Sequence, residues 1–86
     1  MATDIILEKA VDQAREAATE LTEHGVGDHL GFYLEGERVG THRFAAQEPG
    51  YVGWHWAVTM ARAPRARKAT ISEVELLPGQ QALLAP

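Results

Sequence analysis

The chain has 86 residues, enough for one small domain that buries about 60% of the surface exposed by its unfolded form. It contains no cysteine, which excludes disulfides, thiolate ligands and thiol catalysis. The net charge of −4 argues against a general nucleic-acid binder. No apolar run approaches the ~20 residues of a membrane helix, and the N-terminus lacks the features of a signal peptide. We therefore expect a cytoplasmic protein that does not contact a membrane.

The first part of the chain predicts one amphipathic helix over residues 4–24. Thr3 or Asp4 is suited to cap its N-terminus, and Gly25 to end it in the left-handed conformation. Apolar residues recur at spacings of four and three on one helical face: Leu7, Val11, Ala14, Ala18 and Leu21. Acidic residues recur every four positions from Asp4 to Glu20. We interpret this acidic stripe as a solvated outer surface or as a surface that meets a basic partner.

Four strands are predicted after the helix, over residues 29–35, 38–45, 52–62 and 69–77. Turn residues separate them, with Gly36 expected to supply a positive φ in the first turn. The third strand is the strongest prediction, because both tryptophans alternate with smaller residues and share a face with Val58 and Met60. Breaks in the alternation of the second and fourth strands predict a bulge near Gly40 and a second bulge or a twist between Ile71 and Val74.

Short connections make sequential antiparallel neighbours the simplest topology. The fold class is therefore α+β, a single domain over residues 1–86 with one N-terminal helix packed on a four-stranded antiparallel meander. We expect the helix to cover a face built from Leu30, Phe32, Leu34, Trp54, Trp56, Val58 and Met60. The other face, which holds Tyr33, His42, His55 and Thr59, is predicted to be solvated or to form an interface.

Three segments resemble a known family. They are Gly-Trp-His-Trp-Ala-Val-Thr from Gly53, Glu-Val-Glu-Leu-Leu-Pro-Gly from Glu73, and Ala-Leu-Leu-Ala-Pro from Ala82. From Asp28 onward the chain is similar to the N-terminal part of an actinobacterial family of uncharacterised proteins, a catalogued domain of unknown function. The resemblance implies a bacterial cytoplasmic protein and brings no catalytic residue. Members of that family continue past this last segment, which implies that the chain is truncated at its C-terminus or is a short paralogue.

No arrangement of side chains predicts an enzyme. Ser72 is the only serine, and it lies within a predicted strand without the glycine elbow of a nucleophile. Glu73 and Glu75 share one face of that strand, where we interpret them as solvent-facing charges rather than as an acid–base pair. We therefore expect a non-enzymatic protein without a cofactor.

The sharpest local signal is the basic turn between the third and fourth strands. It holds half of all the Lys and Arg residues of the chain: Arg62, Arg65, Arg67 and Lys68. On a hairpin tip these cations can track phosphates, with Tyr33, His42 and Arg43 extending the patch along the sheet. A solvated tip and contact with an acidic protein are the alternatives.

Three functional hypotheses follow from these surfaces. The first is a non-enzymatic protein-interaction or self-association module that uses the uncovered sheet face and the apolar Leu83 and Leu84. The second is a nucleic-acid-binding regulatory domain that uses the basic turn. The third and most distant is a metal or small-ligand site at His42 and His55, completed by a carboxylate such as that of Glu48 or Glu73.

Overall fold

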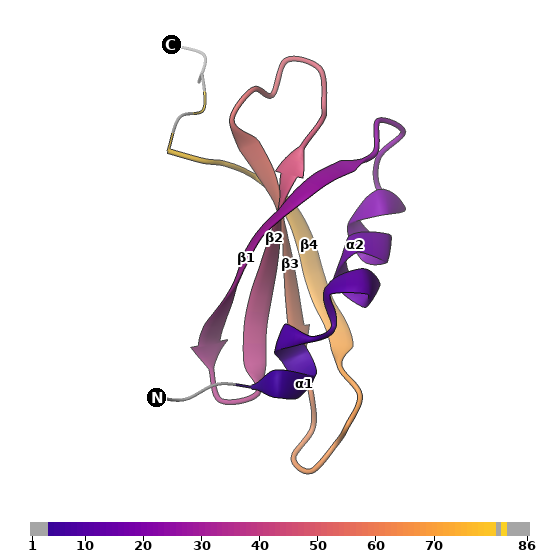
Figure 1. Ribbon diagram of the computed structural model, residues 1–86, viewed down its shortest axis with the longest axis vertical. Helices are drawn as coiled ribbons and strands as arrows, with labels where there is room; N and C mark the ends of the chain where they lie inside the picture. Colours follow the sequence, from indigo (N-terminus) through magenta and orange to yellow (C-terminus); the bar gives the residue numbers. More distant parts are fainter. Residues whose placement is uncertain (1–3, 81, 83–86) are drawn as a thin grey trace.

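The chain forms a four-stranded antiparallel sheet and two short helices in the computed structural model, which describes residues 4–80 and 82 (Figure 1). The strands are β1 (Val26–Gly36), β2 (Val39–Ala46), β3 (Trp54–Ala61) and β4 (Thr70–Pro78). They lie side by side in chain order, and each is antiparallel to the next. The α+β class and the sheet order predicted from the sequence agree with this arrangement.

The prediction of one helix over residues 4–24 is wrong. The structure has two helices, α1 (Ile5–Glu8) and α2 (Val11–Thr19). Asp4 caps α1, because its Oδ1 accepts the amide of Leu7 at 3.1 Å. In a continuous helix the Leu7 carbonyl would accept the amide of Val11. It instead accepts the amide of Ala10 at 3.1 Å and a side-chain donor from the sheet, His42 Nε2, at 2.7 Å, and the helix breaks there.

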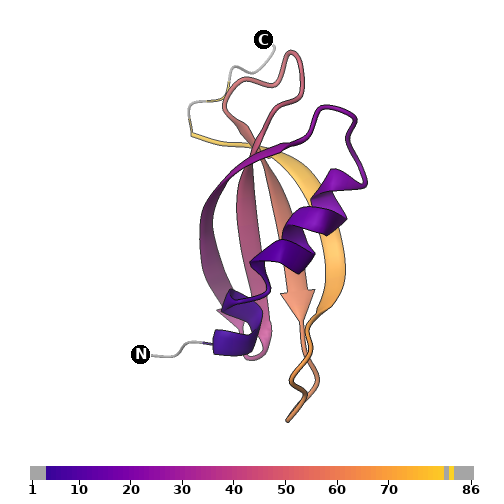
Figure 2. The same ribbon diagram turned by 45° about the vertical axis from the view of Figure 1, so that its right-hand side comes forward.

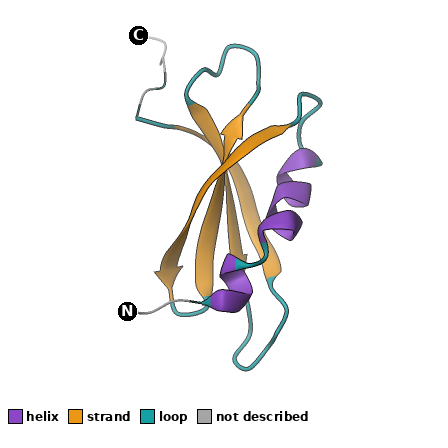
Figure 3. Cartoon of the chain, viewed as in Figure 1, coloured by secondary structure: helices purple, strands orange, loops and turns teal. Residues whose placement is uncertain are grey.

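Both helices lie on the same face of the sheet, and α2 crosses it diagonally (Figures 2 and 3). One buried cluster contains residues of the helices and of the two central strands: Leu7, Ala14, Ala18, Phe44, Trp56, Val58 and Met60. Side chains of α2 also bond to the backbone at two places. Gln13 Nε2 donates to the carbonyl of Ala69 at 2.9 Å, and Arg15 Nη1 donates to that of Gly27 at 2.8 Å. The helix is thereby tied to segments at both edges of the sheet.

The residues of β3 lie as their alternation predicts, but those of β1 and β2 do so only in part. Leu30 is 53% exposed, so it does not belong to the core. His42, which we expected on the uncovered face, is fully buried on the helix-covered face. Its position follows from the register, since His42 stands opposite Val58 and directly opposed residues share a face.

One of the two predicted bulges is present. The register of β3 and β4 shifts between Thr59 and Met60, and Ser72 has no partner across the sheet there. The pairing of β2 with β3 is regular past Gly40, so a bulge in β2 itself is wrong; the register shift next to Gly40 lies in β1, between Leu34 and Gly36. Gly40 instead leaves room for the ring of Phe32, which lies where a Cβ atom would stand.

The turn between β1 and β2 also differs from the prediction. Gly36 does not take a positive φ; Arg38 does, at 59°. The described part of the chain contains no helix that is long and apolar enough to cross a membrane.

Candidate functional site

The sheet face turned away from the two helices is the first candidate site, and we call it the open face. A shallow hollow of about 290 Å³ lies on it. The open face is made by side chains from all four strands: Tyr33, Glu35, Val39, Thr41, Arg43, His55, Ala57, Thr59, Glu73, Glu75 and Leu77. The sequence placed Tyr33, His55 and Thr59 on this face, as the structure does.

Small side chains make the centre of the open face flat. Thr41 and Ala57 are only 5% and 7% exposed, although no helix covers them. The hydroxyl groups of Thr41 and Thr59 lie 3.2 Å apart across β2 and β3 and share a hydrogen bond. The centre therefore has few polar groups free for solvent, and a second flat surface can approach it closely.

Opposite charges flank this centre. Arg43 on β2, Ala57 on β3 and Glu75 on β4 stand in one row across the sheet. The guanidinium of Arg43 lies 4.4 Å from the centre of the Tyr33 ring, and its Nε is buried without a hydrogen-bond partner. The negative charge of Glu75 and a hydrogen bond between the two carboxyl groups raise the pKa of Glu73. The open face is thus positive at β2 and negative at β4, with a further carboxylate, that of Glu35, on β1.

His55 adds a buried ring nitrogen to the open face. Its Nε2 is buried without a partner. Burial, and to a smaller extent the charge of Arg43, lower the pKa of His55, so the neutral imidazole is favoured.

The metal hypothesis is contradicted by the register. His55 stands opposite Ala45, whereas His42 stands opposite Val58, and the two rings lie on opposite faces of the sheet. Within residues 4–80 and 82 there is no group of three or more His, Cys, Asp or Glu side chains that could hold a metal ion.

The ring of His42 instead forms hydrogen bonds within the core. Its Nε2 bonds to the Leu7 carbonyl, which can only accept, so this nitrogen carries the proton. The neutral ring then accepts at Nδ1 from His29 Nε2, at 2.9 Å. The rings of Phe32 and Phe44 flank it, with centroids 4.7 and 6.4 Å away. The sequence did not reveal this histidine pair, because it depends on a register shift within β1.

The basic turn, residues 62–68, projects beyond the end of the sheet at which β4 begins (Figure 1). Arg62 is not part of its tip. The Nε of Arg62 contacts both carboxylate oxygens of Asp4, at 2.9 and 3.1 Å, and its Nη1 donates to the carbonyl of Ala66 at 3.3 Å. Arg65, Arg67 and Lys68 are exposed. The cations of the tip are thus three rather than four.

The patch that we expected to extend from the tip along the sheet does not form as predicted. His42 is buried on the helix-covered face, while Tyr33 and Arg43 stack on each other on the open face. Leu83 and Leu84 lie outside the described residues. The acidic stripe of the helices is exposed at Glu8, Asp12, Glu16 and Glu20, but Asp4 is buried and paired.

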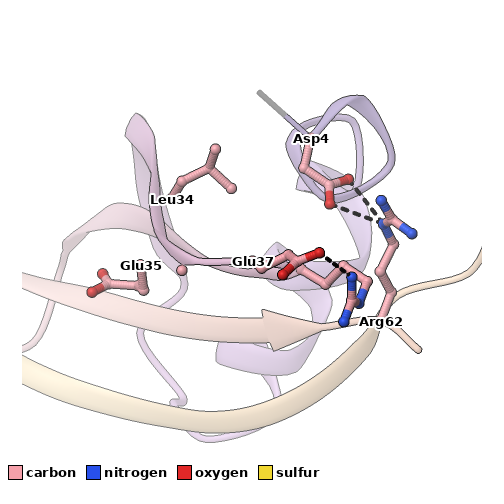
Figure 4. Close-up of a pocket in the computed structure, with 7 residues that line it drawn as sticks. Asp4, Leu34, Glu35, Glu37 and Arg62 are labelled. Atoms are coloured by element: carbon pink, nitrogen blue, oxygen red, sulfur yellow. Dashed lines mark hydrogen bonds and ion pairs between the residues drawn. The ribbon is translucent and has the colours of Figure 1, made fainter. Parts of the chain in front are cut away.

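A larger hollow, of about 480 Å³, lies beside the Asp4–Arg62 pair (Figure 4). Leu34, Glu35 and the β1–β2 turn line it. Its charged groups are largely paired with one another, since Arg38 also forms an ion pair, with Glu37 at 2.6 Å.

The fold defines a small α+β domain, and comparison with known proteins gives its family. Residues 27–86 match the family described as "Protein of unknown function (DUF3027)". The chain belongs to this family, and the matched range contains all four strands apart from Val26.

The chain is 52% identical over 82 residues to the uncharacterized protein Rv0877 of Mycobacterium tuberculosis (strain H37Rv). It shows the same identity to the uncharacterized protein Mb0901 of Mycobacterium bovis. Each match covers 94% of this chain and 31% of the relative, so the chain spans about a third of the length of these proteins. No solved structure matches the chain significantly.

Proposed function

We propose that the chain is a non-enzymatic protein-interaction module that self-associates through its open face. The observation that carries this proposal is the distribution of charge on that face. Arg43 on β2 lies on one side of a flat neutral centre and Glu73 and Glu75 on β4 lie on the other, while Glu35 of β1 adds a carboxylate at the edge beyond β2. A surface that carries both signs on opposite sides is complementary to a copy of itself.

Apolar side chains that remain exposed at the margins of the open face support the proposal. Tyr33 is 45% exposed and Leu77 is 36% exposed. A second chain laid on this face covers these apolar margins.

Light scattering at two protein concentrations and two salt concentrations tests self-association. We expect a mass that rises from monomer to dimer with concentration. Thr59→Arg places a long charged side chain at the centre of the open face and is expected to give a monomer. Thr19→Arg makes the same change at an exposed position of α2 and is expected to keep the dimer. A monomeric parent protein at every concentration overturns the proposal.

A second candidate function is the binding of nucleic-acid phosphates by the basic turn. Its support is the exposure of Arg65, Arg67 and Lys68 on a segment that projects beyond the sheet. From the sequence, we propose the bacterial cytoplasm as the location for both functions. Neither proposed function uses a cofactor.

A further inference from the structure

We infer that two copies of the chain meet face to face about a two-fold axis that runs along β3, so that Arg43 of each copy faces Glu75 of the other. This inference rests on the proposed function and adds the geometry of the association. It follows from the register of the sheet and from the positions of the charges on the open face.

A face-to-face pair of identical sheets has its two-fold axis in the plane between them, because the same surface of each copy must contact the other. The axis can run across the strands or along them. An axis across the strands lays β2 on β2 and β4 on β4 of the second copy. That arrangement brings Arg43 near Arg43 and the glutamates near the glutamates, which like-charge repulsion disfavours.

An axis along β3 exchanges the neighbours of that strand. It lays β2 of one copy over β4 of the other, and it leaves the position along the strands unchanged. Arg43, Ala57 and Glu75 form one row across the sheet, with Ala57 in the middle. The two copies of this row therefore face each other in opposite order. Arg43 lies over Glu75 of the second copy, and Ala57 lies over Ala57 of the second copy.

A neighbouring row is complementary in size at its two ends. Ala45, His55 and Leu77 stand opposite one another on β2, β3 and β4. Reversal of this row lays the half-exposed Leu77 over the small Ala45 of the second copy and His55 over its equivalent at the axis. Facing sheets lie about 10 Å apart with their strands about 30° from parallel, so large side chains pack best against small ones.

The electrostatics of the open face favour the same pairing. Glu73 and Glu75 repel each other, and this repulsion raises the pKa of Glu73. Within the described chain Arg43 makes no ion pair, since β3 separates it from Glu75. The second copy supplies what each side lacks: a cation for the two glutamates and a carboxylate for the guanidinium of Arg43.

The expected interface is small. Three strands of each copy overlap, and strands about 4.8 Å apart with eight residues at about 3.3 Å each give about 750 Å² of total buried surface. Interfaces below about 1,200 Å² are typical of weak or transient association. We therefore expect a dimer that dissociates on dilution and is weakened by salt, because salt screens its two symmetry-related ion pairs.

Charge exchange at the two positions tests the pairing. Arg43→Glu and Glu75→Arg are each expected to raise the dissociation constant by about tenfold or more, because each brings like charges together twice in the dimer. The double variant exchanges the charges and is expected to restore dimerisation to near the parent value. Glu20→Arg, on the exposed end of α2, makes the same change as Glu75→Arg and is expected to leave the dissociation constant unchanged.

Cross-linking gives a test that needs no change of charge. The chain contains no cysteine, so Thr59→Cys introduces a single thiol on β3, close to the expected axis. A short bis-maleimide is expected to link two copies of this variant, and not two copies of Thr19→Cys.

The outcomes separate the two proposals. A dimer that both single charge variants leave unchanged, or that the double variant does not restore, overturns this geometry and leaves self-association standing. Failure of Thr59→Cys to cross-link while the dimer persists also overturns the geometry. A parent protein that stays monomeric overturns the proposed function itself.

Discussion

The imidazole of His42 donates a hydrogen bond to the backbone carbonyl of Leu7 at 2.7 Å and so joins the centre of the sheet to the end of α1. The ring is fully buried, between Phe32 and Phe44 and against His29. Burial lowers the pKa of His42; the bond to Leu7 and the charge of Glu8 oppose this shift, and His29 adds to it. The folded protein therefore favours the neutral ring.

Acidification is expected to destabilise the fold through this histidine. A group whose pKa is lower in the folded state contributes stability above its unfolded pKa and loses it as the pH falls toward the folded value. For His42 the loss begins below about 6.5, the ordinary pKa of histidine. Urea denaturation between pH 7.5 and 4.5 is expected to show a falling free energy of unfolding.

A glutamine at position 42 isolates the titration of the ring. His42→Gln keeps an N–H donor in reach of the Leu7 carbonyl but does not titrate, so the fall between pH 6.5 and 4.5 is expected to shrink. His24→Gln, at an exposed histidine, is expected to retain it. An unchanged pH profile of His42→Gln contradicts this account of the buried ring.

Asp4 contributes to stability in two separable ways, as the cap of α1 and as the partner of Arg62. Asp4→Asn keeps a good capping side chain and loses the ion pair, whereas Asp4→Ala loses both. We expect a cost of about 1–2 kcal/mol for the asparagine variant and about 1 kcal/mol more for alanine. Denaturant unfolding at neutral pH measures both values.

The carboxylate of Asp4 also makes the stability of the fold depend on pH in the acidic range. The hydrogen bond from Arg62 is the main cause that lowers the pKa of Asp4, with Leu7 and Ile6 amides adding to it against the effect of burial. Its contribution is present above the ordinary pKa of aspartate and is lost as the pH falls through the lower folded value. Asp4→Asn should therefore flatten the stability profile below about pH 4. If the free energy of unfolding falls equally in acid for Asp4→Asn and for the parent protein, the Asp4–Arg62 ion pair does not make this contribution.

Local patterns were sufficient to predict the sheet but not the helices. The alternation around Trp54 and Trp56 defines β3 because a half-buried central strand leaves a period of two in its own sequence. The break between α1 and α2 has no such local signal. It depends on the Leu7 carbonyl, which bonds to His42, 35 positions further along the chain.

The residues of the candidate site were predicted only in part. Alternation alone placed Tyr33, His55 and Thr59 on one face. The prediction misplaced His42, although His42 has the same parity as Phe44 in the regular strand β2 and both side chains lie on the helix-covered face. Arg62 was assigned to the basic tip because its partner, Asp4, is 58 positions away in the sequence.

Gly40 is expected to tolerate no side chain. A Cβ atom at this position would overlap the ring of Phe32, which packs over the glycine from β1. Overpacking of this kind costs about 1–3 kcal/mol, so Gly40→Ala should lower the melting temperature by roughly 4 °C or more. Gly36→Ala is the matched control, since no atom lies within 4 Å of its Cβ position. Equal melting temperatures for the two variants would show that the ring of Phe32 moves aside without cost.

The basic turn allows a direct test of the second candidate function. If Arg65, Arg67 and Lys68 contact phosphates, the affinity for a short single-stranded oligonucleotide should fall steeply with salt. Three contacts predict a slope of about −2 in a plot of log K against log salt concentration. The double variant Arg65→Glu with Arg67→Glu should abolish binding, while Lys9→Glu, on the exposed surface between the helices, should preserve it. Fluorescence anisotropy measures the salt dependence and the affinities of both variants.

Binding that is independent of salt, or that survives the double variant, rules out phosphate contact by this turn. The exposed cations are then a solvated tip or contact an acidic protein.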